Sequence, residues 1–239
     1  MQKIINEKWL TAKGVIGFWK AGRTAPDTIS IHDDSGEEIN RLEFLRQQIK
    51  KAAGQPEFSL ADFIAAEERG ISDYIGAFAV SIAGIEPHLE RFIADHDDYN
   101  KIMLQAMADR LVESFAECLH HKVRTEFWGY APEESLAFDD IIKEQYQGIR
   151  PAPGYPACPD HTEKWKLFDL LGATENTGII LTDHLAMHPA ASVCGWYFSH
   201  PQSHYFGVGK ISEDQFQDYL GRKKMPEAQL RRWLQQNME

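Results

Sequence analysis

HDDYNKIMLQAMADRLVESFAE (96–117) is the stretch that decides the fold, because it carries the clearest periodic pattern in the chain. From about Asp97 to Val123, apolar residues recur at spacings of three, four and five. They are Ile102, Ala106, Leu111, Phe115, Cys118, Leu119 and Val123. These spacings place most of the apolar side chains on one face of a helix. At about 1.5 Å per residue, roughly thirty residues make a helix about 45 Å long, which spans a whole domain.

Segments typical of β-strands lie on both sides of this predicted helix. Before it come VIGFW (15–19), TISIH (28–32), EINRLEF (38–44) and DYIGAFAVSIAG (73–84), with a hairpin turn at 33–36. After it come ILTDHLAM (180–187), SVCGWYFSH (192–200) and HYFGVGK (204–210). Strands and helices occur in blocks rather than in strict alternation. The pattern therefore predicts an α+β fold with a twisted antiparallel sheet and long flanking helices.

Shorter helices are expected elsewhere in the chain. They are residues 1–10, the basic segment LRQQIKKAA (45–53), residues 136–146, HTEKWKLFDLLG (161–172) and two helices in the last forty residues. Ser212 is placed to begin the first of the last two. No segment has the composition of a linker, so residues 1–239 are expected to form one domain.

The charge and composition of the chain exclude several classes of protein. The 36 acidic and 25 basic side chains give a formal net charge of −11, whereas proteins that bind nucleic acids on their own are usually basic. A negative surface can tolerate a cationic ligand. Neither a membrane-spanning apolar run nor a secretory signal is present. With three widely spaced cysteines, Cys118, Cys158 and Cys194, these features predict a cytoplasmic protein without disulfides.

The segment RPAPGYPACPDHTEK (150–164) contains four of the eleven prolines. Each proline fixes its own φ and restricts the residue before it, so residues 150–160 are expected to form a stiff extended strap. Gly154 permits close approach of another backbone or a flat ligand. Asp160, followed by Glu163, predicts an N-cap and capping box for the next helix. The strap is either a connector with Arg150 in a surface salt bridge, or a ligand-binding segment in which Arg150 meets a carboxylate or phosphate.

Residues 192–209 are rich in aromatic residues and glycine, and they predict a hairpin of two strands around residues 201–203. Strand alternation places Val193, Gly195 and Tyr197 on one face. Cys194, Trp196 and Phe198 then lie on the other face. The segment is either a packed sheet core or a surface that holds an adenine-like ring or a sulfonium cation against aromatic rings.

Metal sites and familiar catalytic motifs are not indicated. Three pairs have spacings that metals use, namely Cys158/His161, His184/His188 and His200/His204, but none belongs to a strong metal-binding motif. Patterns for a serine nucleophile, a phosphate-binding loop and a dinucleotide fold are missing. Glu113 and Glu144 lie on amphipathic helices, where solvent exposure is a sufficient explanation for a carboxylate.

Three segments together indicate a family. They are HDDYNKIMLQAMADRLVESFAE (96–117), YQGIRPAPGYPACPDHTEK (146–164) and ASVCGWYFSHPQSHYFGVGKI (191–211). With WGYAPEE (128–134) and DYIGAFAV (73–80), they resemble the C-terminal activation domain of cobalamin-dependent methionine synthase. The resemblance runs from about Glu7 to the C-terminus. It implies that the chain begins inside the family's domain, without the helical segment whose aspartate binds the amino group of the ligand.

The resemblance implies a function as well as a fold. Domains of this family bind S-adenosylmethionine and present its methyl group when the cobalamin of methionine synthase has oxidised to cob(II)alamin. A flavodoxin-type reductase supplies the electron, another module of the enzyme holds the cobalamin, and the homocysteine and folate modules complete methionine biosynthesis. The chain is thus expected to act as part of a methyltransferase, without catalytic residues or metal ligands of its own.

The resemblance also implies the residues of the ligand site. Arg150, Ala152 and Tyr155 of the proline-rich motif, Tyr205 and Phe206 of the last strand, and the carboxylates Glu113 and Glu144 match family residues near the ligand. Two alternatives remain open. One is an interaction module of the same fold that docks on a cobalamin domain or flavodoxin without binding S-adenosylmethionine. The other is an unrelated methyltransferase, which would need a glycine-rich nucleotide loop.

Overall fold

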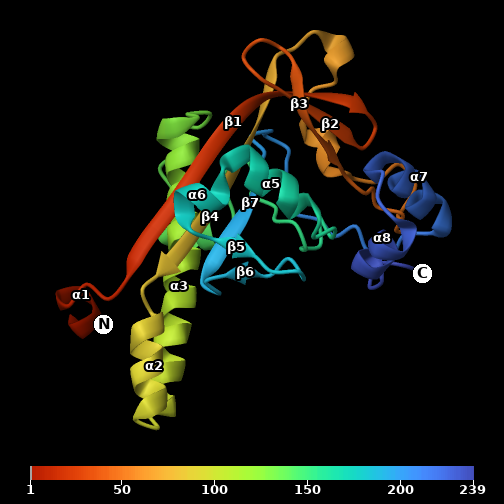
Figure 1. Ribbon diagram of the computed structural model, residues 1–239. Helices are drawn as coiled ribbons and strands as arrows, with labels where there is room; N and C mark the ends of the chain where they lie inside the picture. Colours follow the sequence, from red (N-terminus) through yellow and green to blue (C-terminus); the bar gives the residue numbers. More distant parts are fainter. Residues whose placement is uncertain (1) are drawn as a thin grey trace.

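A five-stranded antiparallel sheet forms the centre of the computed structural model, which describes residues 2–239 (Figure 1). Its strands lie in the order β3-β2-β1-β4-β7. Their bounds are Thr11–Ala25 for β1, Thr28–His32 for β2, Glu38–Glu43 for β3, Asp73–Ala83 for β4 and Ser192–Tyr197 for β7. Every neighbouring pair is antiparallel, so the predicted α+β class and sheet type are confirmed.

The strand β4 is the most deeply buried part of the sheet. It pairs with β1 over eleven residues, from Thr11 opposite Ala83 to Ala21 opposite Asp73, and its other edge pairs with β7. Small and β-branched residues dominate it, and its middle is buried on both faces. Gly76 is required there because a Cβ atom would come within 3.1 Å of the side chains of Phe18 and Tyr197.

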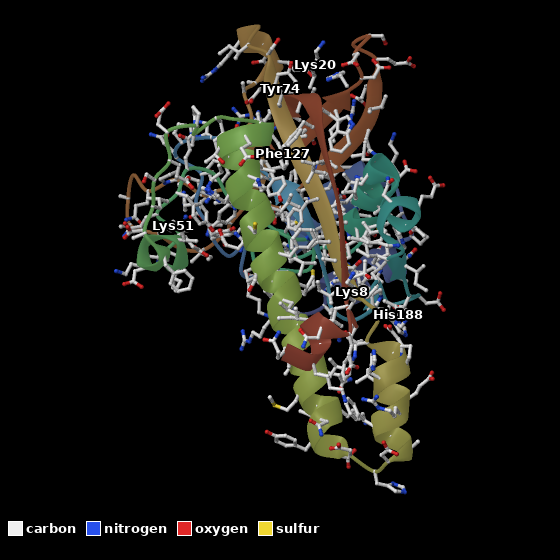
Figure 2. All side chains as sticks on the ribbon, turned by 90° about the vertical axis from the view of Figure 1, so that its left-hand side faces the viewer. Lys8, Lys20, Lys51, Tyr74, Phe127 and His188 are labelled. Carbon is white, nitrogen blue, oxygen red and sulfur yellow. The ribbon has the colours of Figure 1, made fainter. Side chains whose placement is uncertain are left out.

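One face of the sheet is covered by α2 (Glu86–Ala94) and the long helix α3 (Asp98–Lys122). Figure 2 shows α3 running across β1 and β4, with Phe127 near its far end. The short helix α1 (Gln2–Asn6) lies near α2 and α3. Asp97 caps α3 by accepting a hydrogen bond from Asn100 N at 3.0 Å. The predicted long helix is therefore confirmed.

The predicted buried face of α3 is only partly right. The fully buried residues recur every fourth position, at Leu104, Ala108, Val112, Ala116 and His120. Ile102 is 62% exposed and Cys118 is also exposed, although both belong to the predicted apolar face. The first half of α3 extends with α2 beyond the sheet (Figure 1), so that half has only α2 and α1 to pack against. Leu111, Phe115 and Leu119 of the predicted face do pack on the core beside the fully buried residues, but they are only partly buried.

The opposite face carries α5 (Glu163–Leu171) and α6 (Ala173–Thr177), which pack against a core that includes Trp196 and Ile29. A third core, around Phe216 and Tyr219, joins α7 (Glu213–Lys223) and α8 (Glu227–Leu234) to the end of β3. The two C-terminal helices and the start at Ser212 are as predicted. The chain ends lie on opposite sides of the molecule (Figure 1). Among residues 2–239, no helix is long and apolar enough to cross a membrane.

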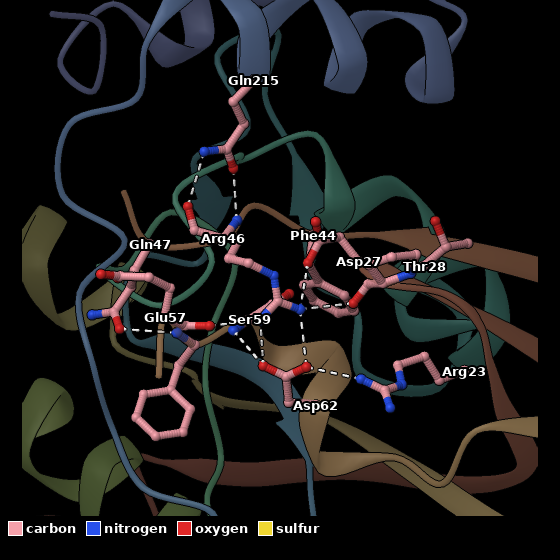
Figure 3. A network of polar contacts seen from close by, with 12 residues as sticks. Arg23, Asp27, Thr28, Phe44, Arg46, Gln47, Glu57, Ser59, Asp62 and Gln215 are labelled. Carbon is pink, nitrogen blue, oxygen red and sulfur yellow. Dashed lines mark hydrogen bonds and ion pairs between the residues drawn. The ribbon is translucent and has the colours of Figure 1, made fainter. Parts of the chain in front are cut away.

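The predicted basic helix at 45–53 is wrong, because this segment contains no helix. Its backbone donors bond to distant residues instead: Arg46 N donates to Gln215 Oε1 at 2.7 Å, and Gln47 N donates to the carbonyl of Phe58 at 3.0 Å. The side chain of Arg46 also pairs with Asp27 and Asp62 (Figure 3). Tertiary hydrogen bonds thus replace those that a helix would have made.

Two expectations for the last third are also wrong. Residues 204–210 form no strand, so the predicted hairpin around 201–203 does not exist, and Val208 N donates to the carbonyl of Pro156 instead. Residues 180–187 form no single strand; they fold back as β5 (Ile180–Leu181) and β6 (Met187–His188). The alternation along β7 is confirmed, because Trp196 and Tyr197 lie in the cores on opposite faces.

The helix predicted at 136–146 is shorter, and the helix after the strap starts later than predicted. The former is α4 (Phe138–Ile142), with Phe138 and Ile142 exposed. The latter is α5, whose N-cap is Thr162 rather than Asp160. Asp160 accepts from Thr162 N at 2.8 Å and pairs with Lys223 at 2.9 Å. Glu163 also pairs with Lys223. The carboxylates of Asp160 and Glu163 therefore share an ion-pair partner, and they do not form the predicted capping box.

Candidate ligand-binding site

A cavity of about 550 Å³ lies between α3, the strap and the edge of the sheet. This volume falls within the range of small-molecule sites. All seven residues that the sequence predicts for the site line it: Glu113, Glu144, Arg150, Ala152, Tyr155, Tyr205 and Phe206. Phe78 and Cys194, from two neighbouring strands, complete part of the wall. Residues nearly one hundred positions apart are thus brought around one space.

The strap forms one wall because it adds to the free edge of β7. Ile149 and Phe198 exchange two backbone hydrogen bonds of 3.0 Å, and Trp196 N donates to the carbonyl of Pro151 at 2.9 Å. Gly195 makes this approach possible, because a Cβ atom there would lie 2.9 Å from the carbonyl oxygen of Pro151. Gly154, at φ +94°, leaves room for the ring of His161. A close backbone approach is thus observed at Gly195, whereas the neighbour of Gly154 is the His161 side chain and not the backbone or flat ligand that was predicted.

The segment 204–210 holds the strap from the other side. The backbone N–H of Arg150 donates to the hydroxyl of Tyr205 at 3.0 Å, and Val208 N donates to the carbonyl of Pro156 at 2.8 Å. Burial raises the pKa of Tyr205, so its hydroxyl stays protonated. The strap is not extended as predicted, because turns fold it back on itself: Tyr155 N donates to the carbonyl of Ala152 at 3.1 Å, and Gly154 N donates to that of Cys158 at 2.7 Å. It is nevertheless fixed along both sides, which leaves it as a preformed wall of the cavity.

Arg150 is both an ion-pair partner and a cavity residue. Its Nη1 lies 2.8 Å from Glu117 Oε2, 3.2 Å from His120 Nδ1 and 3.2 Å from the hydroxyl of Tyr146. Burial opposes its charge, yet Glu117 holds the pKa of Arg150 above its ordinary value. Within residues 2–239, Nε and Nη2 have no hydrogen-bond partner. One edge of the guanidinium is thus occupied and the other is free.

The carboxylates of Glu113 and Glu144 line the cavity without a cationic partner among residues 2–239. Both residues are exposed. Glu144 also has φ +56°, a left-handed conformation that costs a residue with a Cβ roughly 1–2 kcal/mol. Two uncompensated negative charges favour a ligand that carries positive charge.

Sequence reasoning missed the residues behind Arg150, namely Glu117, His120, Arg124, Glu134 and Tyr146. A signal was present, because Glu113, Glu117, His120 and Arg124 recur every three or four residues and so form a polar stripe on α3 and its continuation. Arg124 lies in the π-helical turn η3 (Val123–Phe127), is fully buried and makes two bonds of 2.8 Å to Glu134. Its burial beside Glu117 and Arg150 places this polar stripe directly behind the cavity.

The inner wall contains a lysine and a cysteine. Lys164 is buried, and its Nζ donates to the carbonyl of Leu185 at 2.9 Å and lies 3.2 Å from His161 Nδ1. Burial lowers the pKa of Lys164 and raises that of Cys194 to about 12. Cys194 is therefore a thiol at neutral pH, not a reactive thiolate. The cavity therefore combines a buried lysine with a protonated thiol on its inner wall.

Other candidate groups lie apart from this cavity. No group of three or more His, Cys, Asp or Glu residues in the described part of the chain could hold a metal ion. His200 and His204 lie beside the rings of Phe58 and Phe63, at a second cavity of about 560 Å³. Cys118, Cys158 and Cys194 are all free thiols.

The fold and the cavity define a small-molecule-binding module of the α+β class. Residues 1–224 match the family "Vitamin B12 dependent methionine synthase, activation domain", and the chain belongs to this family. It is also similar to a crystal structure of the MetH reactivation domain bound to AdoHcy, with a TM-score of 0.94 and 49% sequence identity. That similarity covers 99% of this chain and 73% of the other. The predicted family and fold are confirmed.

Proposed function

We propose that this chain binds S-adenosylmethionine in the cavity and presents its methyl group for the reductive reactivation of cob(II)alamin in methionine synthase. The observation that carries the proposal is the convergence of all seven expected residues on one cavity of suitable size. The similarity to a domain bound to AdoHcy, the demethylated product of this ligand, supports the same conclusion. Reactivation keeps the enzyme able to transfer methyl groups to homocysteine.

The groups around the cavity match the parts of this ligand. The free edge of Arg150 suits the carboxylate of the amino-acid moiety, because a guanidinium fork fits a carboxylate in two parallel hydrogen bonds. Glu113 and Glu144 favour the ammonium and the sulfonium. Tyr205 and Phe206 supply aromatic walls, while Ala152 and Tyr155 contribute from the strap.

The chemistry asks little of the chain beyond orientation. A sulfonium is already a good leaving group, so no general acid or base is required to release the thioether. Cobalamin, bound by a partner module, supplies the nucleophile, and a flavodoxin-type reductase supplies the electron. The residues of this chain hold the methyl group in line for attack, which is where positioning lowers a barrier most.

Calorimetric titration of the 239-residue chain with S-adenosylmethionine and with S-adenosylhomocysteine tests the proposal. We expect both ligands to bind at one site, and fusion of the family's preceding helical segment to tighten binding. Binding of neither ligand, with or without that segment, would contradict the proposal. Retained binding to a cobalamin module in that case would favour an interaction module.

A further inference from the structure

We propose that Glu117 and His120 of α3, together with Tyr146, are positioning residues that hold one edge of the Arg150 guanidinium. This Arg150 clamp leaves the other edge turned to a ligand carboxylate. The inference rests on the proposed function and deepens it. It assigns a role to three residues for which the family resemblance implied none.

All three partners of the Arg150 side chain converge on one atom. Glu117 Oε2, His120 Nδ1 and the hydroxyl of Tyr146 lie 2.8, 3.2 and 3.2 Å from Nη1. A guanidinium is planar, so the hydrogen bonds of Nη1 with His120 and Tyr146, together with its ion pair with Glu117, restrict the orientation of the group. Nε and Nη2 remain without a partner within residues 2–239, and together they form the side-on fork that a carboxylate accepts.

His120 can accept a hydrogen bond from Arg150 only as a neutral ring. Its side chain is fully buried, and burial, followed by the charges of Arg124 and Arg150, holds its pKa well below the ordinary value. With Nδ1 as acceptor, the proton lies on Nε2, which is 3.5 Å from the hydroxyl of Tyr130. The ring stacks on Tyr197 with centroids 5.2 Å apart, so its orientation is fixed.

Glu117 is held in turn from behind. Its Oε1 lies 3.9 Å from Nη1 of Arg124, whose guanidinium makes two bonds of 2.8 Å to Glu134 and lies 4.1 Å from the centre of the Tyr146 ring. Glu117 therefore bridges one arginine that is wholly buried and one that reaches the cavity. The chain orders Arg150 before any ligand arrives, and the ligand need not immobilise a flexible side chain.

A purely structural network would make a different prediction. Loss of packing behind the cavity would weaken every ligand that occupies it. Loss of the clamp would weaken only ligands with a carboxylate for Arg150. S-adenosylhomocysteine has this carboxylate, whereas 5′-methylthioadenosine keeps the nucleoside and thioether but lacks the amino-acid end. The two compounds therefore separate positioning from packing.

The test is calorimetric titration of the full chain with both compounds in wild type, Glu117→Gln and His120→Phe. We expect each variant to bind S-adenosylhomocysteine roughly two- to tenfold more weakly, the cost of ordering one long side chain on binding. The affinity for 5′-methylthioadenosine should not change. Glu126→Gln, the same substitution at an exposed glutamate paired only with Lys122, is the matched control and should bind both normally.

Several outcomes would overturn the inference. If both compounds lose affinity equally in the variants, Glu117 and His120 act through packing. If neither compound loses affinity, the Arg150 clamp contributes nothing to binding. A wild-type chain that binds neither compound, with or without the family's preceding helical segment, would contradict the proposed function itself. If the variants do not fold, NMR of the ligand-free wild type decides: separate, slowly exchanging guanidinium signals for Arg150 are expected, and signals averaged by free rotation would contradict the clamp.

Discussion

The two ends of the strap carry buried charges that are arranged in opposite ways. At its start, Arg150 uses one nitrogen for Glu117, His120 and Tyr146 and leaves an edge open to the cavity. At its end, Asp160 accepts from Thr162 and from the hydroxyl of Tyr219, and it also pairs with Lys223. The first end leaves one edge of its cation without a partner within residues 2–239, whereas both carboxylate oxygens of Asp160 at the second end have partners.

Exposure shows the same contrast. The side chains of Asp160, Glu163 and Lys223 are 2%, 0% and 5% exposed, so water reaches none of them appreciably. The side chains of Arg150 and Glu117 are 20% and 29% exposed. A closed cluster stabilises the fold, whereas a half-open one keeps a charge available. The comparison teaches that pairing alone does not distinguish a structural charge from a functional one.

Removal of the cation from the closed end should have the largest effect. Lys223→Met leaves Asp160 and Glu163 buried without their shared partner, and we expect the free energy of unfolding to fall by about 3–5 kcal/mol. Urea unfolding measures this loss. Lys50→Met, at an exposed lysine, is the control. A loss below about 1 kcal/mol would show that the buried charges at the closed end contribute no more to stability than those at the open end.

Removal of the cation from the open end should affect binding instead. Arg150→Ala deletes a charge-assisted contact worth roughly 1.5–3 kcal/mol, so affinity for S-adenosylmethionine should fall roughly ten- to a hundredfold. Because Glu117 keeps some exposure to water, stability should fall much less than in Lys223→Met. Titration calorimetry compares the variant with Arg110→Ala, at an exposed arginine of α3. Normal binding by Arg150→Ala would remove its proposed role.

The open end should also give the fold a measurable pH dependence. His120 is surrounded by Arg124, Arg150, Glu117 and tyrosines, and its pKa is lowered by burial and by the two arginines. The unfolded chain therefore takes up a proton below about pH 6.5 that the folded chain does not, and stability falls as pH decreases toward the lowered pKa.

The slope of the free energy of unfolding against pH measures this effect. His120→Phe should flatten it by up to about 1.4 kcal/mol per pH unit. An unchanged slope in His120→Phe would mean that this histidine is charged in the folded protein.

The smallest expected effect separates strain from binding at Glu144. Glu144→Gly relieves the left-handed conformation and should raise stability by about 0.5–1 kcal/mol, while loss of the carboxylate weakens binding of S-adenosylmethionine. His96→Gly, at another exposed left-handed residue with φ +55°, should raise stability without altering affinity. If Glu144→Gly binds S-adenosylmethionine as tightly as wild type, the carboxylate and the left-handed conformation of Glu144 contribute nothing to ligand binding.

The sequence predicted the elements whose patterns are local. Periodicity located α3, and alternation correctly assigned the two faces of β7. The helix at 45–53 failed because Arg46 and Gln47 bond to residues far along the chain, which no local pattern records. The hairpin after 201 failed because residues 204–210 bond to the strap, not to β7.

The candidate site, like the fold, could be predicted only in part from the sequence. The family resemblance located the seven residues that line the cavity. It did not single out the polar residues behind Arg150, although Glu117, Glu134 and Tyr146 lie within the quoted segments, because a segment does not record which of its polar side chains meet Arg150. Their relation to Arg150 exists only after α3 and the strap have met across the edge of the sheet. The roles of all these residues toward a ligand remain predictions for the experiments above.

The prolines of the strap have a consequence for how molecules of this protein meet one another. A sheet that ends in an unpaired strand can recruit a strand from a second chain and grow into an aggregate. Here the edge of β7 pairs with the strap, and Pro151, Pro153, Pro156 and Pro159 have no N–H to offer a further strand. At its β7 edge, the sheet can therefore keep an open cavity without exposing a template for polymer growth.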